Sequence, residues 1–102
     1  MNKLIAKLQL TIGTTLTGEL DEETINKLNT LGLTHDIIKF VQEFLNTIVH
    51  HKIALTGKYD RDTREAVIYL QKEYAYKYGV NITEYGKLNE STWKLIGILA
   101  KK

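Results

Sequence analysis

The residues in this chain that could do chemistry are three histidines, twelve acidic residues and a set of aromatic side chains. His50 and His51 are adjacent, and neighbouring residues on a helix point about 100° apart, so the two cannot share a metal ion. With His35 included, these histidines are better explained as surface residues at a helix end. No Ser-His-Asp arrangement, phosphate-binding glycine loop or zinc-protease helix motif is visible. The sequence therefore predicts a protein that is not an enzyme and has no metal site or cofactor.

The aromatic residues favour binding rather than catalysis. Tyr69 and Tyr76 lie seven residues apart and off the helix face of Ala66, Leu70 and Tyr74, which predicts that at least one is exposed. An exposed tyrosine offers flat apolar area with a hydrogen-bonding tip, which suits sugar rings and short peptides. For Trp93 the preferred interpretation is core packing, and for Gln71 it is a hydrogen bond to a loop backbone. The candidate ligand contacts are Tyr59, Tyr69, Tyr76, Tyr85, Trp93 and Gln71.

A seven-residue pattern supplies the frame for these side chains. From Gly57 to Thr63, a turn glycine is followed by an aromatic residue, an aspartate and, three residues later, a threonine. Asp60 is expected to cap a helix by accepting from its free N–H groups, with Thr63 at the third helical position. The pattern occurs three times, as an internal repeat whose positions are best explained by turn and cap chemistry. These positions are Gly18, Asp21, Thr24, Gly57, Asp60, Thr63, Gly86, Asn89 and Thr92.

The composition is that of an ordinary globular chain. It has 102 residues, of which 43% are hydrophobic and 25% charged, with a formal net charge of +2. This length can bury one core without disulfides, which the absence of cysteine excludes. The net charge is too small to indicate nucleic acid, although residues 52–102 carry ten Lys and Arg against six acidic residues. No segment has the pattern of a membrane span, and Lys7 and Gln9 interrupt the only stretch similar to a signal peptide.

Helical periodicity accounts for most of the chain. Apolar residues recur at helix spacing over about residues 2–12, 22–31, 34–51, 61–78 and 90–100. Gly32 and Gly79 are placed to end the second and fourth of these helices. There is no proline, and no linker rich in glycine or serine divides the chain, so a single core is expected. The predicted fold is all-α, a small bundle of about five helices joined by glycine turns.

Residues from about 35 to 98 resemble the peptidoglycan-binding module appended to bacterial and phage cell-wall hydrolases. That family has a helix with Val-Gln and a spaced Leu, a glycine turn leading to Thr, a helix with Ala-Val and Gln, and a second glycine turn before Thr-Trp. The matching positions are Val41, Gln42, Leu45, Gly57, Tyr59, Thr63, Ala66, Val67, Leu70, Gln71, Gly86, Leu88, Thr92, Trp93 and Ile96. The resemblance implies a three-helix module in residues 34–102. Residues 1–33 look like a shortened half-repeat packed on the same core.

The resemblance implies a non-catalytic module that binds the glycan or stem peptide of bacterial peptidoglycan and targets a partner hydrolase or assembly to the wall. The expected location is the cell wall or a phage particle, with a cell-wall hydrolase domain or phage structural proteins as partners and no nucleic acid or membrane. Asp21, Asp60 and Asn89 replace the second glycine of the family's turn, which alters the loop surface. These altered loops favour an alternative, a structural or protein–protein interaction module of a phage particle or spore coat that keeps the fold without binding sugar.

Overall fold

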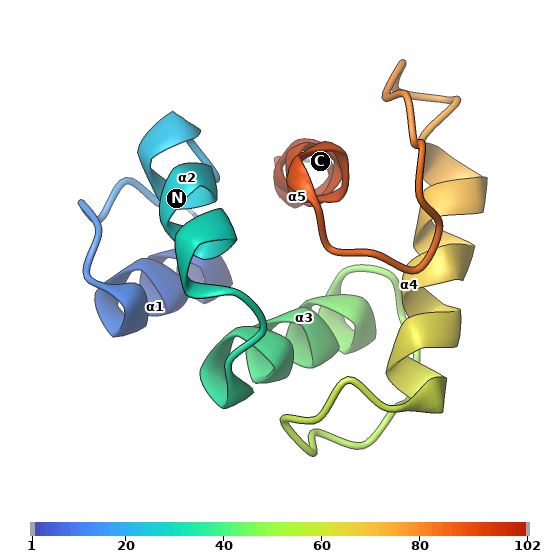
Figure 1. Ribbon diagram of the computed structural model, residues 1–102, viewed down its shortest axis with the longest axis horizontal. Coiled ribbons are helices and arrows are strands. Elements are labelled where there is room, and N and C mark those ends of the chain that lie inside the picture. Colours follow the sequence, from blue (N-terminus) through green and yellow to red (C-terminus); the bar gives the residue numbers. More distant parts are fainter. Residues whose placement is uncertain (1, 102) are drawn as a thin grey trace.

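The computed structural model describes residues 2–101 and contains five α-helices (Figure 1). They are α1 (Lys3–Ile12), α2 (Glu22–Leu31), α3 (His35–Thr47), α4 (Arg61–Tyr74) and α5 (Glu90–Ala100). No strand occurs within the described part of the chain. The prediction of an all-α fold with about five helices is confirmed.

A polar side chain begins every helix. The five residues at these positions have extended backbones, and the side-chain oxygen of each accepts from the backbone N–H three residues later. Such bonds satisfy N–H groups that the helix itself leaves unpaired. The three caps expected from the repeated pattern, Asp21, Asp60 and Asn89, are confirmed, and Asn2 and Thr34 cap α1 and α3 in the same way.

Two helices end earlier than their hydrophobic pattern predicts. Helix α3 stops at Thr47 rather than near His51, because His50 is left-handed, with φ of 63°, and the His51 N–H bonds back to the Leu45 carbonyl. Glycine normally occupies such a position, so the sequence does not signal this end. Helix α4 stops at Tyr74, and irregular turns continue to Gly79, whose φ of 72° closes the segment.

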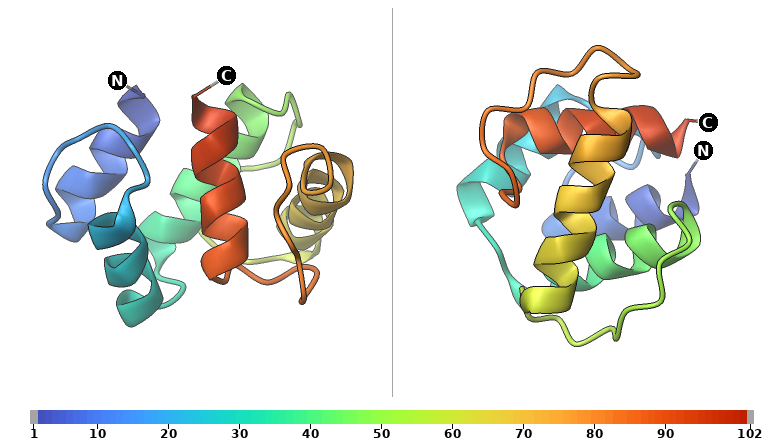
Figure 2. Two further views of the ribbon diagram at one scale, coloured as in Figure 1. Left: turned by 90° about the horizontal axis from the view of Figure 1, so that it is seen from above. Right: turned by 90° about the vertical axis from the view of Figure 1, so that its right-hand side faces the viewer.

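The five helices form a closed ring. Helix α1 lies beside α2 and α3, α4 lies beside α3 and α5, and α2 meets α5 to complete the ring. In Figure 1, α5 is seen end-on between α2 and α4, with α3 below it. Figure 2 shows that α4 crosses both α3 and α5 steeply. The space inside this ring is where the side chains of the core meet.

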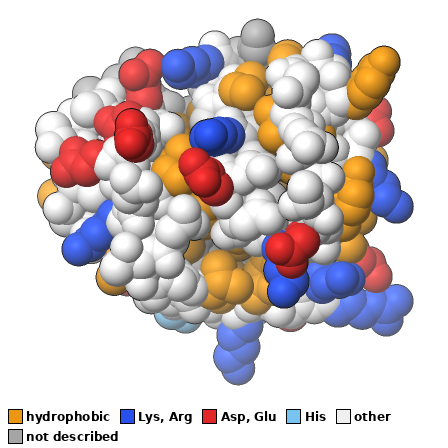
Figure 3. All heavy atoms as spheres, turned by 45° about the horizontal axis from the view of Figure 1, so that its top comes forward, with side chains coloured by type: hydrophobic (Ala, Val, Ile, Leu, Met, Phe, Trp, Pro, Cys, Tyr) orange, Lys and Arg blue, Asp and Glu red, His pale blue; other side chains and the backbone are white. Residues whose placement is uncertain are grey.

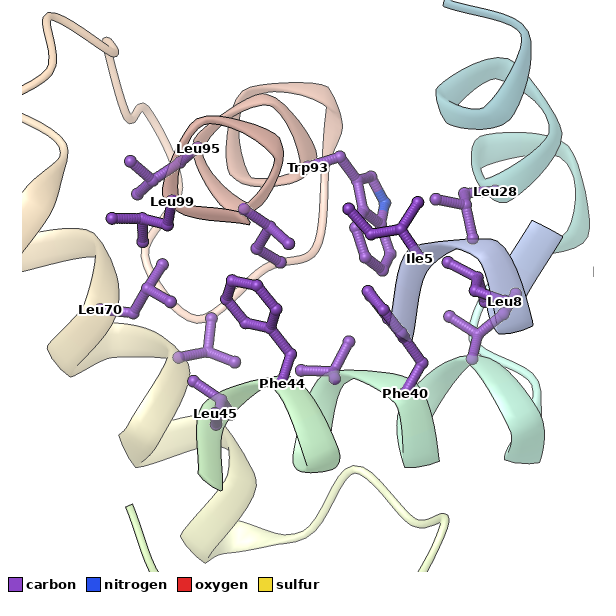
Figure 4. Packing of buried hydrophobic residues seen from close by; sticks show 14 of the residues in the cluster. Ile5, Leu8, Leu28, Phe40, Phe44, Leu45, Leu70, Trp93, Leu95 and Leu99 are labelled. Carbon is purple, nitrogen blue, oxygen red and sulfur yellow. The ribbon is translucent and has the colours of Figure 1, made fainter. Parts of the chain in front are cut away.

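Residues from all five helices build one hydrophobic core. Phe40 and Phe44 of α3 lie near Trp93 of α5, and the ring centroids of Phe40 and Trp93 are 6.4 Å apart (Figure 4). Helices α1 and α2 close the same cluster with Ile5, Leu8, Ile12, Ile25 and Leu28. Helices α1 and α2 therefore share one core with the rest of the described chain.

Leu8 and Leu10 offer a direct test of this packing because they lie on the same helix. Leu8 is 3% exposed and Leu10 is 71% exposed. We expect Leu8→Ala to lower the free energy of unfolding by about 2–5 kcal/mol, because a truncated core leucine leaves a cavity. Leu10→Ala should change it by about 0.5 kcal/mol or less. Chemical denaturation followed by circular dichroism measures both values, and equal effects would contradict a core shared with α1.

Candidate functional site

Buried glutamines organise the three repeated turns. Gln42 of α3 is 0% exposed, and its side-chain oxygen accepts from the Gly57 N–H at 2.9 Å. Its amide nitrogen donates to the Thr63 hydroxyl at 2.9 Å and to the Lys58 carbonyl at 3.1 Å, and it also lies 3.0 Å from the Thr56 hydroxyl. One side chain thereby joins α3 to the turn and to the first residues of α4.

Gln9 and Gln71 repeat this arrangement. Their side-chain oxygens accept from the N–H groups of Gly18 and Gly86 at 2.9 and 2.8 Å. Their amide nitrogens donate to the hydroxyls of Thr24 and Thr92 at 2.9 and 2.8 Å. The glutamine precedes its glycine by 15 positions in the second and third copies but by 9 in the first, so the first copy has the shorter loop.

This geometry corrects two of the predicted ligand contacts. Gln71 is 0% exposed and binds the third turn from inside, so a ligand at the surface cannot reach it. Trp93 is 1% exposed and packs in the core near Phe40. Sequence reasoning also misses the role of Gln9 and Gln42 in the turns. A signal was available, since the chain has only three glutamines and each precedes one copy of the seven-residue pattern.

The aspartate caps hold the first two turns from outside. Asp60 Oδ1 accepts from the N–H and the hydroxyl of Thr63 at 3.0 and 2.7 Å, and Oδ2 accepts from the Thr56 hydroxyl at 3.1 Å. Asp21 is bound in the same way by Thr24 and Thr17. The side-chain bonds from Thr63 and Thr24 favour the ionised carboxylates and hold the pKa of Asp60 and Asp21 below the ordinary value of 3.8.

The third turn differs from the other two. Tyr85 occupies the position before the glycine, where the earlier copies have Thr17 and Thr56. The helix that follows this turn is capped by the neutral Asn89. The Tyr59 hydroxyl donates to the Gly86 carbonyl at 2.6 Å, and burial raises the pKa of Tyr59 to about 12. Tyr59 thus joins the second turn to the third. This bond gives Tyr59 a structural role, and its part in ligand binding stays a prediction.

The other three predicted tyrosines reach the surface. Tyr69, Tyr76 and Tyr85 are 47%, 96% and 48% exposed. The ring of Tyr69 meets the His51 ring at a right angle, with centroids 5.0 Å apart. Tyr76 lies in the turns that follow α4, and Tyr85 lies in the third repeated turn. The structure places these side chains in three different surroundings.

A different pair of tyrosines borders a hollow. Tyr74 and Tyr78 stack with ring centroids 6.4 Å apart and planes inclined by 19°. They line a hollow of about 340 Å³ between the C-terminal ends of α3, α4 and α5. The Lys77 ammonium lies 5.8 Å from the centre of the Tyr78 ring. The other lining residues are Thr47, Ile48, Val49, His50 and Leu99.

The sequence pattern places Tyr74 on the same helix face as Ala66 and Leu70, and Tyr78 follows it by four residues. That face is buried along Ala66, Val67 and Leu70, each of which is at most 4% exposed. Tyr74 is the last residue of α4 and Tyr78 lies in the turns that follow, and both are only partly buried against the core. Ile48, Val49 and His50, which follow the early end of α3, line the same hollow, and the sequence carries no ordinary signal for that end.

The three histidine side chains have different surroundings. His35 packs on Gly57, His50 lines the hollow, and His51 contacts Tyr69. Within residues 2–101 no group of three or more His, Asp or Glu side chains could hold a metal ion. On the face drawn in Figure 3, acidic and basic side chains are interspersed among small hydrophobic areas. Several basic side chains lie near one another at the lower right of that face.

Comparison with known proteins gives no relative: no family model, curated protein or solved structure matches this chain. Function must therefore be argued from the turns, the hollow and the exposed side chains. None of the helices described for residues 2–101 is long and apolar enough to cross a membrane.

Gln42→Leu tests the glutamine joint, by which we mean the hydrogen bonds that join a buried glutamine to its repeated turn. The variant keeps a buried apolar side chain but removes the acceptor of the Gly57 N–H, whereas the Thr63 hydroxyl keeps its bond to Asp60. Because a buried group left unpaired costs about 1–3 kcal/mol, we expect the free energy of unfolding to fall by at least about 1 kcal/mol. Asn29→Leu, an amide-to-leucine change at an exposed position of α2, is the control and should change it by about 0.5 kcal/mol or less. A loss in Gln42→Leu no larger than in the control would contradict the proposed role of the amide.

The two aspartate caps predict a dependence on pH. Folding lowers the pKa of Asp21 and Asp60, so their contribution to stability is complete above the ordinary value of 3.8 and is lost as the pH falls through the lower folded values. The double variant Asp21→Asn/Asp60→Asn keeps both caps as amides, as at Asn89, and does not titrate. We expect its melting temperature to fall less than that of the wild type on acidification. Thermal unfolding at several acidic pH values tests this, and identical acid profiles would show that these caps carry no proton linkage.

Proposed function

We propose that this chain is a non-catalytic module that binds bacterial peptidoglycan, with a sugar ring held in the hollow beside Tyr74 and Tyr78. The observation that carries this proposal is the stacked tyrosine pair at the rim of a hollow of about 340 Å³. Small-molecule sites in proteins usually have volumes of about 300–1,000 Å³. The ligand class comes from the resemblance of residues 35–98 to the peptidoglycan-binding module.

The chemistry of the lining suits a sugar. Tyrosine rings present apolar faces on which the C–H groups of a sugar can pack. Ile48, Val49 and Leu99 extend the apolar surface, and no acidic side chain is among the described lining residues. A shallow site of this kind binds a single ring weakly. A wall presents the same unit many times, and repetition or tethering raises the effective concentration.

Exposed leucines favour a second candidate function, a protein–protein interaction module within a phage particle or coat. Leu10, Leu16, Leu31 and Leu33 are between 41% and 71% exposed, and all lie in the first 33 residues. Single exposed apolar residues are common on protein surfaces. Four within the half-repeat give a specific reason to consider a protein partner there.

Co-sedimentation with purified cell-wall sacculi tests the proposal. We expect the wild type to sediment with sacculi and Tyr78→Leu to bind about two- to tenfold more weakly, because an aromatic contact contributes about 0.5–1.5 kcal/mol. Leucine keeps apolar volume at the rim but removes the ring. Tyr69→Leu is the matched control, since Tyr69 contacts His51 outside the residues that line the hollow.

The outcomes separate function from site. A wild-type protein that stays in solution contradicts peptidoglycan binding and favours the interaction module. Wild-type binding that survives both Tyr74→Leu and Tyr78→Leu shows that the hollow is not the site. Loss of binding in Tyr69→Leu or Tyr76→Leu would instead return the site to the exposed tyrosines indicated by the sequence.

A further inference from the structure

A planar side chain covers the turn glycine in the second and third copies. His35, seven residues before Gln42, packs so closely on Gly57 that an added Cβ would overlap its ring. Arg64, seven residues before Gln71, places its guanidinium 3.0–3.2 Å from the position that a Cβ of Gly86 would occupy. Gly57 and Gly86 have φ of 73° and 78°, so glycine serves these turns both by its backbone conformation and by leaving room for the flat group.

The peptide under Arg64 is itself held firmly. The Gly86 N–H donates to the Gln71 side chain at 2.8 Å, and the Gly86 carbonyl accepts from the Tyr59 hydroxyl at 2.6 Å. The guanidinium therefore rests on a backbone unit that is fixed from two other sides. A group ordered before binding loses less conformational entropy when a ligand arrives.

Arg64 carries a positive charge that the described residues do not pair. The other arginine of the chain, Arg61, has its Nε 3.0 Å from Glu65, whereas no carboxylate of residues 2–101 lies within ion-pair distance of Arg64. The acidic residues on either side of the third turn have their own partners, Glu84 with Lys87 at 3.7 Å and Glu90 with Lys94 at 3.4 Å. The cap of this turn is a neutral amide, whereas the first two turns have a carboxylate there.

At the position before its glycine, the third turn has an exposed tyrosine in place of a threonine. In the earlier copies, Thr17 and Thr56 donate to the cap aspartate at 2.9 and 3.1 Å. Tyr85 at the same position is 48% exposed and directly precedes Gly86, on which the guanidinium lies. Of the three turns, this one has an exposed aromatic residue directly before the glycine on which a guanidinium outside any ion pair of residues 2–101 lies.

From this arrangement we propose that Arg64 and Tyr85 form a second binding site, one that accepts the carboxylate of a polar ligand. The planar fork of a guanidinium matches the two oxygens of a carboxylate, and the tyrosine ring packs against the body of the ligand. The choice of ligand rests on the proposed function and is N-acetylmuramic acid, whose carboxylate is free where the wall glycan carries no stem peptide. Arg64 precedes Tyr74 by ten residues, about 15 Å along α4, so this site is separate from the hollow.

Titration of the isotopically labelled protein, followed by NMR, tests this proposal. The ligands are N-acetylmuramic acid, N-acetylglucosamine, which has the same ring type without the carboxylate, and acetate. We expect the wild type to prefer the sugar acid and the signals of Arg64 and Gly86 to shift on binding. Arg64→Gln should weaken binding of the acid by about tenfold or more, as expected for a lost charged hydrogen bond. Arg64→Lys should keep only part of the preference, and Arg61→Gln, the matched control, should keep all of it.

Each outcome decides a defined part of the proposal. A wild type that does not discriminate the two sugars, or a preference that survives Arg64→Gln in a protein with a well-dispersed spectrum, overturns it. Acetate that binds as tightly as N-acetylmuramic acid overturns the role assigned to Tyr85. A preference that depends on Arg64 in a protein that fails to bind sacculi supports the carboxylate site and refutes the proposed function alone.

Discussion

The bonding capacity of a buried primary amide is the constraint on which this structure depends. A glutamine side chain carries an acceptor and two donors on one planar group, so it can bind a turn N–H together with a carbonyl and a hydroxyl beyond it. Asparagine would be one methylene shorter, and an ionised glutamate would have no donor. Because Gln9, Gln42 and Gln71 are 0% exposed, an unpaired polar atom there would be costly. The glycine, the cap and the threonine of each turn are arranged around that requirement.

Helix α4 connects two of these joints and so sets the geometry of the second half of the chain. Thr63 in its first turn receives the amide of Gln42, and eight residues later Gln71 binds the third turn. Because both sets of bonds involve residues of α4, this helix fixes the positions of α3 and α5 relative to each other. Helix α2 receives Gln9 at Thr24 but ends at Leu31, and the chain has no further glutamine to continue the series. Packing of α1 on α3 and of α2 on α5 fixes the half-repeat instead.

Features with local determinants could be predicted from the sequence, and features with distant partners could not. The starts of α2, α4 and α5 depend on a cap and a threonine three residues later, and the pattern predicts all of them. The glutamines precede their glycines by 9 residues in one copy and by 15 in the other two, so the signal for their bonds is that each glutamine precedes one copy of the pattern. The Tyr59 hydroxyl bonds a carbonyl 27 residues away, which no local spacing reveals. The hollow at Tyr74 and Tyr78 requires a left-handed histidine where glycine is the usual signal. Tyr85 is a candidate from the sequence alone, but the position of the Arg64 guanidinium on the neighbouring Gly86 depends on how the turn folds.

The difference in loop length between the copies has a consequence for protein engineering. The joint forms equally well whether glutamine and glycine are 9 or 15 positions apart, so the intervening residues are not required to close it. The entropy cost of closing a flexible loop grows slowly, by about 0.6 kcal/mol for each doubling of its length. The connectors before Gly57 and Gly86 are therefore natural points at which to graft a foreign peptide. A peptide grafted there is held at both ends by the folded chain, so the protein can serve as a small, cysteine-free scaffold that displays the peptide.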